Sequence, residues 1–153
     1  MKRASVYRRR KQFLSHSSSQ TEDGVWVACP PFLSVPESGG DPELEHAIRD
    51  ALRRSESNVP RVREWSRVIK PLLDLAGVKS WSALVKGATL VEVIDDGAQI
   101  VIIPMTSLGA DDGFQEDITR RTSIDAGTAL GQPVRELLSA APGSREHSRD
   151  AAR

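Results

Sequence analysis

The sequence has little cysteine and no long apolar segment. Cys29 is its only cysteine, which excludes an intramolecular disulfide bond and a zinc site built from several cysteines. The chain contains no run of about 18 apolar residues, the length that a membrane-spanning helix requires. The basic start M-K-R-A-S-V-Y-R-R-R-K also lacks the apolar stretch of a secretory signal. We therefore expect a soluble, cytoplasmic protein without a membrane partner.

The sequence also lacks the common signatures of catalysis and of bound cofactors. It contains no G-x-S-x-G elbow, no G-x-x-x-x-G-K-S/T phosphate loop and no G-x-G-x-x-G fingerprint. His16, His46 and His147 lack the paired spacing of a metal-binding helix, and we expect all three on the solvated surface. The sequence predicts a protein that is not an enzyme and that binds no cofactor and no metal.

Charge of one sign is missing from two parts of the chain, although the formal net charge is zero. The span 1–11 contains bases and no acid, whereas the span 87–118 contains acids and no base. An acidic surface attracts a basic partner, so the second span supplies the candidate contact residues. The acids of this span are Glu92, Asp95, Asp96, Asp111, Asp112, Glu116 and Asp117. The candidate contact residues, which we call the acidic block, are the last six of them. Adjacent aspartates also occur simply as turn formers, which is the alternative interpretation of the two Asp-Asp pairs.

The basic opening supports a different hypothesis about function. Tyr7 and Phe13 are interleaved with the bases Arg8, Arg9, Arg10 and Lys11, an arrangement that could bind RNA through phosphate contacts and base stacking. The alternative is a strand whose charged outer face discourages pairing with another sheet edge. Because the net charge is zero, we do not expect a nucleic-acid partner for the chain as a whole.

Apolar periodicity and turn residues predict both strands and helices. Asp96-Gly97 between two apolar runs is typical of a tight hairpin turn, and the continuously apolar run 100–103 indicates a strand covered on both faces. The polar run S-H-S-S-S-Q-T-E-D-G predicts a loop between the first two strands. The predicted strands are 5–15, 24–29, 89–94, 99–104 and 118–124, and the predicted outer helices are 41–55 and 127–140.

A central amphipathic segment predicts two further helices. Apolar residues at three- and four-residue spacing line one face of the first: Val62, Trp65, Ile69, Leu72, Leu73 and Ala76. Pro71 should kink or restart this helix, Gly77 should end it, and Ser80 should cap the next one. We expect Trp65 and Trp81 in the core, the alternative being that they anchor an interface.

The two outer helices are similar in sequence, since P-E-L-E-H-A-I-R-D-A-L aligns with T-A-L-G-Q-P-V-R-E-L-L. The matched positions are Leu44 with Leu130, Ile48 with Val134, Arg49 with Arg135, Asp50 with Glu136 and Leu52 with Leu138. This pattern allows a two-copy β-β-α arrangement, although amphipathic helices also align by chance. We expect one α/β domain of the α+β kind over residues 1–141, a mainly antiparallel sheet with packed helices, and a disordered tail over 142–153.

Three segments resemble a known family. K-P-L-L-D-L-A-G-V-K-S-W is the most specific, with W-V-A-C-P-P before it and I-V-I-I-P-M-T-S-L-G-A-D-D-G-F after it. Together they resemble the immunity proteins of bacterial contact-dependent growth inhibition systems, over roughly 6–141. The chain departs from the family pattern at Pro133 and after Pro142. We assign to maintenance of the fold the residues that match the recurring pattern of the family: Lys70, Pro71, Gly77, Lys79 and Trp81.

The resemblance implies a small, non-catalytic cytoplasmic protein that binds a cognate toxin C-terminal domain and occludes its active site. Toxins of such systems are frequently nucleases, which must offer positive charge to phosphate, so a carboxylate surface could compete for the same site. The first hypothesis is therefore an immunity protein that contacts its toxin through the acidic block. The rival is an RNA-binding accessory protein that uses the basic N-terminal strand. The sequence leaves the toxin, the affinity and the oligomeric state open.

Overall fold

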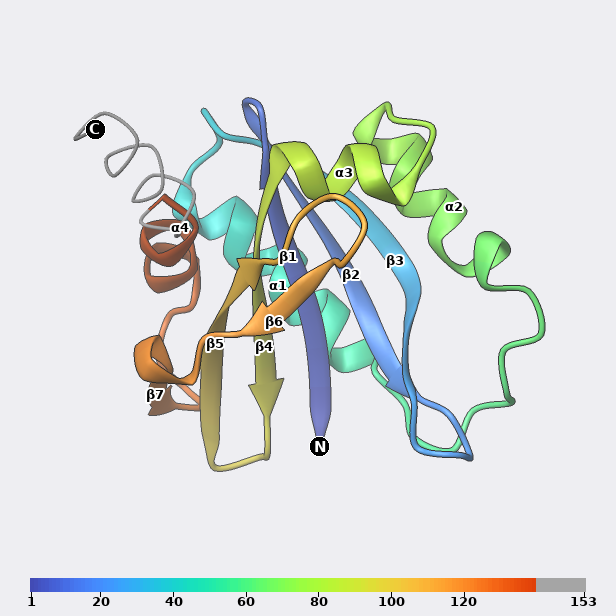
Figure 1. The fold of residues 1–153 in the computed structure, drawn as a ribbon. Coiled ribbons are helices and arrows are strands. Elements are labelled where there is room, and N and C mark those ends of the chain that lie inside the picture. The colour runs from blue at the N-terminus through green and yellow to red at the C-terminus, as the bar shows by residue number, and fades with distance from the viewer. Residues whose placement is uncertain (140–153) are drawn as a thin grey trace.

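A mainly antiparallel sheet with helices on both faces forms the structure, a computed structural model that describes residues 1–139 (Figure 1). The strands are β1 (Lys2–Arg9), β2 (Gln12–Gln20), β3 (Trp26–Pro36), β4 (Ala88–Asp95), β5 (Gln99–Ser107), β6 (Phe114–Glu116) and β7 (Thr122–Asp125). The helices are α1 (Asp41–Arg54), α2 (Trp65–Ala76), α3 (Trp81–Gly87) and α4 (Gly131–Ser139), with a 3-10 helix η1 (Ile118–Arg120). The expected α+β class is confirmed. The tail predicted over 142–153 lies outside the described residues.

The strand order in the sheet is β3-β2-β1-β4-β5-β6, with β7 also paired to β5. β6 pairs with the C-terminal end of β5 and β7 with its N-terminal half, so these two short strands share one edge of β5. β1 and β4 are therefore the central strands. Their register places Ser5 opposite His16 on one side and opposite Glu92 on the other. Because directly paired residues share a face of the sheet, these three side chains lie on the same face.

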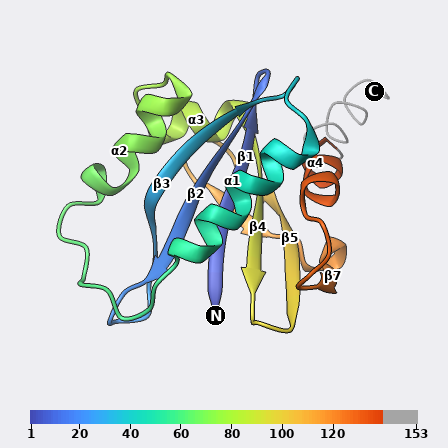
Figure 2. The same ribbon diagram turned by 180° about the vertical axis from the view of Figure 1, so that it is seen from behind.

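The larger core lies between the sheet and helices α1 and α4, which pack side by side on one face (Figure 2). The matched positions of the two helices meet in this core: Leu44, Ile48, Leu52, Leu130, Val134 and Leu138. In the first half the antiparallel strands β1, β2 and β3 precede α1, and in the second half β4, β5, β6 and β7 precede α4. Three strands therefore lie ahead of the first helix and four ahead of the second.

The opposite face of the sheet carries α2 and α3 over a smaller core (Figure 1). The segment 55–64 carries the chain from one face to the other around the end of β2 and β3, where Val59 N–H donates to Gln20 O at 3.0 Å. This second core is smaller because α3 is short and α2 packs mainly on β3, at the edge of the sheet. Part of the sheet face beside the two helices therefore remains open to a pocket.

The first two strands differ from the prediction of one strand over 5–15 followed by a polar loop. The chain turns at Arg10, whose φ is 57°, and the serine-rich run then forms the buried strand β2. The tertiary structure gives partners to two of its hydroxyls: Ser18 Oγ lies 3.4 Å from Ser5 Oγ, and Ser19 Oγ accepts from Glu56 N–H at 3.0 Å. The hydroxyls of Ser15 and Ser17 are buried without a partner in the described residues. No glycine or asparagine marks the turn in the sequence, so the local signal that usually reveals a hairpin is missing.

Several local predictions are confirmed. Gly77 adopts the left-handed conformation at the end of α2, with a φ of 75°, and Ser80 Oγ accepts from Ala83 N–H at the start of α3. The β4–β5 hairpin forms as predicted. Helix α2 continues through Pro71 without ending, and α4 begins only at Gly131. No helix within residues 1–139 is both long enough and apolar enough to cross a membrane.

Candidate functional site

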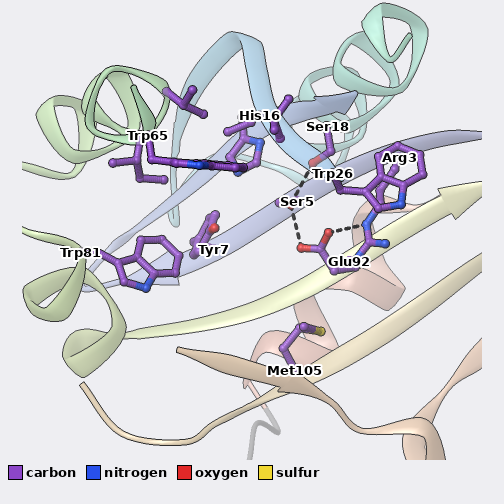
Figure 3. Close-up of a pocket in the computed structure, with 14 residues that line it drawn as sticks. Arg3, Ser5, Tyr7, His16, Ser18, Trp26, Trp65, Trp81, Glu92 and Met105 are labelled. Atoms are coloured by element: carbon purple, nitrogen blue, oxygen red, sulfur yellow. Dashed lines mark hydrogen bonds and ion pairs between the residues drawn. The ribbon is translucent and has the colours of Figure 1, made fainter. Parts of the chain in front are cut away.

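A pocket opens on the sheet face that carries α2 and α3, and we call it the sheet pocket (Figure 3). Its volume is about 340 Å³, within the range of about 300–1,000 Å³ that is typical of small-molecule sites. All three tryptophans and the only tyrosine of the chain line it: Trp26, Trp65, Trp81 and Tyr7. These residues come from β1, β3, α2 and α3, so only the tertiary structure brings them together.

The floor of the sheet pocket is polar and consists of Arg3, Ser5, Ser18 and Glu92 (Figure 3). Arg3 Nε donates to Glu92 Oε1 at 2.8 Å, and Ser5 Oγ donates to Glu92 Oε2 at 2.6 Å. The hydroxyl oxygens of Ser5 and Ser18 are 3.4 Å apart. Burial raises the pKa of Glu92, and the Arg3 guanidinium and the Ser5 hydroxyl oppose this shift. The floor therefore combines a buried carboxylate with its own cationic partner.

The planar guanidinium group of Arg3 is held by a hydrogen bond at one edge and by an aromatic ring on one face. Its Nε is bound to Glu92, and the guanidinium carbon lies 5.4 Å from the centroid of the Trp26 ring. Its terminal nitrogens, Nη1 and Nη2, have no hydrogen-bond partner among residues 1–139. A fixed guanidinium with free terminal donors can bind a hydrogen-bond acceptor that enters the pocket.

His16 and Tyr7 line the pocket beside this floor, and each side chain is almost fully buried. His16 Nδ1 lies 2.8 Å from the backbone oxygen of Ser17, which can only accept, so Nδ1 carries the proton. Burial lowers the pKa of His16 to about 4, which keeps the ring neutral near pH 7. Nε2 is then an acceptor, and in the described chain neither it nor the Tyr7 hydroxyl has a hydrogen-bond partner.

The prediction of a solvated His16 is wrong, whereas His46 is exposed as expected and His147 lies outside the described residues.

The tryptophans at the rim correct a second prediction. Trp65 has an exposed fraction of 55%, so the expectation that it packs in the core is wrong. Trp81 is half-buried and packs edge-on against Tyr7, with ring centroids 6.5 Å apart. Trp65 and Trp81, with Ile69, also line a shallow apolar groove that continues from the pocket. Trp81 thus packs against the smaller core as expected, and only the exposed Trp65 fits the alternative of an interface anchor.

The structure separates the acidic block into parts. Asp95 and Asp96 lie at the β4–β5 turn, whereas Asp111 and Asp112 lie in the loop after the far end of β5. Because β5 has nine residues at about 3.4 Å each, the two pairs are roughly 27 Å apart or more. Asp96 Oδ1 accepts from the backbone N–H groups of Ala98 and Gln99, which lower its pKa. This aspartate is therefore also a turn former.

The other four carboxylates of the block lie between the end of β5 and η1. Asp111 and Asp112 are exposed, and Asp111 Oδ1 accepts from Ser82 Oγ on α3 at 3.4 Å, so this loop borders the sheet pocket's helices. Glu116 is exposed on β6, and Asp117 Oδ1 accepts from Thr119 Oγ1 at 2.6 Å. Asp95 and Asp96 lie at the opposite end of β5 from these four residues, so the six carboxylates do not form one patch.

The basic N-terminal segment does not form a free edge. β1 is paired on both sides, and three of its arginines have partners within the fold. Arg3 pairs with Glu92, Arg8 Nη2 lies 3.0 Å from Glu37 Oε1, and Arg9 Nη1 donates to Ala76 O at 3.2 Å. The RNA-binding hypothesis and the alternative of a charged edge strand both require the basic side chains of this segment to face outward. The prediction of a strand that guards a sheet edge is wrong, because β1 lies in the middle of the sheet.

The residues that sequence reasoning missed are the polar floor and its neighbours. Ser5, His16 and Ser18 were hidden in segments that were interpreted as an ordinary strand and a loop, and Glu92 in an apolar strand. One signal in the sequence could have identified Glu92. This acid lies between Val91 and Val93 in an otherwise apolar run, and an acid in such a position indicates a buried carboxylate with a partner. Within residues 1–139, no group of three or more His, Cys, Asp or Glu side chains could hold a metal ion.

Comparisons with known proteins find solved structures of similar fold, among them the following two. No protein-family model matches the sequence, and no curated protein matches it significantly. A protein of unknown function from Neisseria meningitidis is similar with a TM-score of 0.75 and 15% identity, over 92% of this chain and 94% of that chain. A chain of the CdiA-CT/CdiI toxin and immunity complex from Yersinia pseudotuberculosis is similar with a TM-score of 0.73 and 15% identity, over 92% of this chain and 97% of that chain. The chain therefore shares its fold, over nearly its full described length, with a component of a toxin and immunity complex.

Proposed function

We propose that this protein is a cytoplasmic immunity protein that binds and neutralises the cognate toxin domain of a contact-dependent growth inhibition system. The observation that carries the proposal is the likeness in fold, over 92% of the chain, to a chain of a toxin and immunity complex. The resemblance of the segment from Lys70 to Trp81 to immunity proteins points in the same direction. In this proposal the protein acts by occluding the active site of a toxin that is a nuclease.

Electrostatics supply the second part of the proposal. A nuclease must present positive charge to phosphate, and an inhibitor that presents carboxylates to that surface meets it faster and competes with the substrate. Among the six carboxylates of the acidic block, Asp111 and Asp112 are the best placed to act this way, since both are exposed in a loop beside α3. Glu116 and Asp117 extend the same side of the molecule, and Asp95 and Asp96 would contact the toxin from a separate turn.

The first experiment tests whether the protein neutralises a toxin. Cells that express the toxic C-terminal domain encoded beside this gene are grown with and without this protein, and the two chains are co-purified. We expect restored growth and a stoichiometric complex. Loss of growth in both cultures, with no complex, would refute the proposal.

The second experiment tests the contact surface by association kinetics at low and moderate salt. Asp111→Asn with Asp112→Asn should slow association roughly three- to tenfold at low salt, because charged rim groups mainly set the association rate. The matched control is Glu43→Gln with Glu56→Gln, which removes the same charge from exposed positions outside the acidic block. Asp95→Asn with Asp96→Asn tests the turn, where asparagine keeps the Oδ1 acceptors. Equal rates for the first variant and the control would remove Asp111 and Asp112 from the contact surface.

A further inference from the structure

The sheet pocket presents unused hydrogen-bonding groups under a layer of aromatic rings. Nη1 and Nη2 of Arg3, Nε2 of His16 and the hydroxyl of Tyr7 all lack a partner among residues 1–139. His16 and Tyr7 each have an exposed fraction of only 4%. None of these atoms is among the sealed, unpartnered polar atoms of the described chain, and all belong to residues that line the pocket, so an occupant of the pocket can pair with them.

The rings around these groups favour a flat occupant. Trp65 and Trp81 come from the two helices and Trp26 from β3, on different sides of the polar floor (Figure 3). Tyr7, on β1, contributes a further ring edge-on to Trp81. Flat ligands that stack on tryptophan gain affinity from every π face that they cover.

The charges of the floor disfavour a strongly charged group in contact with the floor itself. Glu92 supplies a negative charge and Arg3, 2.8 Å away, supplies a positive one, so the floor carries no net charge. A phosphate or a carboxylate would meet Glu92, and an organic cation would meet Arg3. A neutral ring whose edge alternates acceptors and donors can instead pair with both, since the guanidinium donates and the carboxylate and His16 Nε2 accept.

We propose that the sheet pocket is a binding site for a purine base, with guanine preferred, as a free nucleoside or nucleotide. Guanine carries adjacent acceptors at O6 and N7, which an arginine can contact together, and N–H donors on the same ring system for a carboxylate. The pocket volume of about 340 Å³ admits one base with its sugar at the opening. This site is independent of the proposed immunity function, which needs only a protein contact.

The test uses the full chain and its own fluorescence, because all three tryptophans line the pocket. Guanosine and guanosine 5′-monophosphate are titrated separately into the millimolar range. We expect saturable quenching by both, with equal affinity, because the uncharged floor gives the phosphate no partner. Adenosine and indole should bind at least several-fold more weakly, because indole lacks the acceptor edge and adenine places a donor where guanine has O6.

Calorimetric titrations of two variants then locate the site. Trp65→Ala should weaken guanosine binding roughly tenfold, since the loss of one stacking surface has an effect of this order. Ile118→Ala is the matched control, because Ile118 is also a large exposed apolar side chain, with an exposed fraction of 68%, and it lies outside the pocket. Both side chains are mainly exposed, so neither variant should unfold.

Four results would overturn the inference. The first is no saturable signal with guanosine. The second is equal weakening, or none, in Trp65→Ala and Ile118→Ala, which would place the bound nucleoside elsewhere. The third is indole binding as tightly as guanosine, which would show that the pocket takes an apolar ring without using its floor. Tenfold tighter binding of a guanine-containing single-stranded RNA than of guanosine would likewise exclude a site for the free nucleoside. Toxin neutralisation is measured separately, so either proposal can fail alone.

Discussion

The ion pair between Arg3 and Glu92 supports a quantitative prediction. The exposed side-chain fractions are 17% for Arg3 and 7% for Glu92, and Arg3 Nε lies 2.8 Å from Glu92 Oε1. At an effective dielectric constant of about 20, two unit charges at this distance attract by about 6 kcal/mol, most of which offsets their removal from water. Arg3→Met removes the attraction but leaves the carboxylate buried.

Breaking a buried pair by removing one partner typically costs about 3–5 kcal/mol. Here Glu92 keeps its hydrogen bond from Ser5, and the pocket admits water, so we expect a loss near the lower end, about 3 kcal/mol at pH 7. For a chain of this size the loss corresponds to a decrease in Tm of about 6–12 °C. Glu92→Gln should cost less, because a neutral amide still accepts from Arg3 and leaves no buried carboxylate.

The pH dependence follows from the direction of the Glu92 shift. The folded-state pKa of Glu92 is raised above its unfolded value of 4.5 by burial, and Arg3 is the largest opposing influence. A raised pKa stabilises the fold fully below the unfolded pKa, and this stabilisation is lost as the pH rises through the folded pKa. Without Arg3 the folded pKa of Glu92 rises further. The penalty in Arg3→Met should therefore be largest at pH 7 and shrink toward pH 4.5.

Denaturant unfolding followed by circular dichroism at several pH values measures these differences. Arg67→Met is the matched control, because Arg67 pairs with Glu64 on the surface and its side chain is 82% exposed; its effect should be near zero. A loss under about 1 kcal/mol in Arg3→Met would show that Glu92 is effectively solvated. A loss that does not change between pH 5 and pH 7 would assign it to the stacking on Trp26 and refute the electrostatic reasoning.

Three further predictions concern the fold. Burial lowers the pKa of His16 to about 4, so the neutral ring contributes stability above the unfolded pKa of 6.5, and this stability is lost as the pH falls toward 4. Between pH 6.5 and pH 4, the free energy of unfolding of the wild type should therefore fall by about 3 kcal/mol relative to that of His16→Gln, measured by denaturant unfolding. Leu138→Ala should cost about 3 kcal/mol by the same assay, because this side chain is 1% exposed in the α1–α4 core, whereas Leu108→Ala, at 46% exposed, should cost under about 0.5 kcal/mol. Gly131→Ala should lower the free energy of unfolding by about 1–3 kcal/mol, because the added Cβ would meet the backbone of Asp41, the first residue of α1. The control is Gly127→Ala, whose added Cβ meets no atom. Equal denaturation midpoints for the two glycine variants would contradict the close approach of α4 to α1.

The sequence alone predicted the features that depend on neighbouring residues. Asp96-Gly97 identified the β4–β5 hairpin because a tight turn requires the backbone angles that these residues adopt readily. Gly77 and Ser80 identified the end of α2 and the start of α3, since a helix end needs a left-handed residue or a side-chain cap. The apolar spacing in 41–55 identified α1 and its buried face. These signals act within a few residues and need no distant partner.

Only the tertiary structure determined the candidate site. The serine-rich run became the buried strand β2 because β1 and β3 pair with it on both sides, and Ser5 and Glu56 give partners to the hydroxyls of Ser18 and Ser19. His16 became neutral and buried because the rings of Tyr7 and Phe32 pack against it. Glu92 could remain inside a valine-rich strand because the neighbouring strand β1 presents Ser5 at the paired position and Arg3 two residues before it, and both donate to the carboxylate. The acidic block is continuous in sequence and divided in space, because the length of β5 holds its two Asp-Asp pairs apart. Local chemistry thus determined where helices and turns occur, whereas burial of polar groups depended on partners that only folding brings within reach.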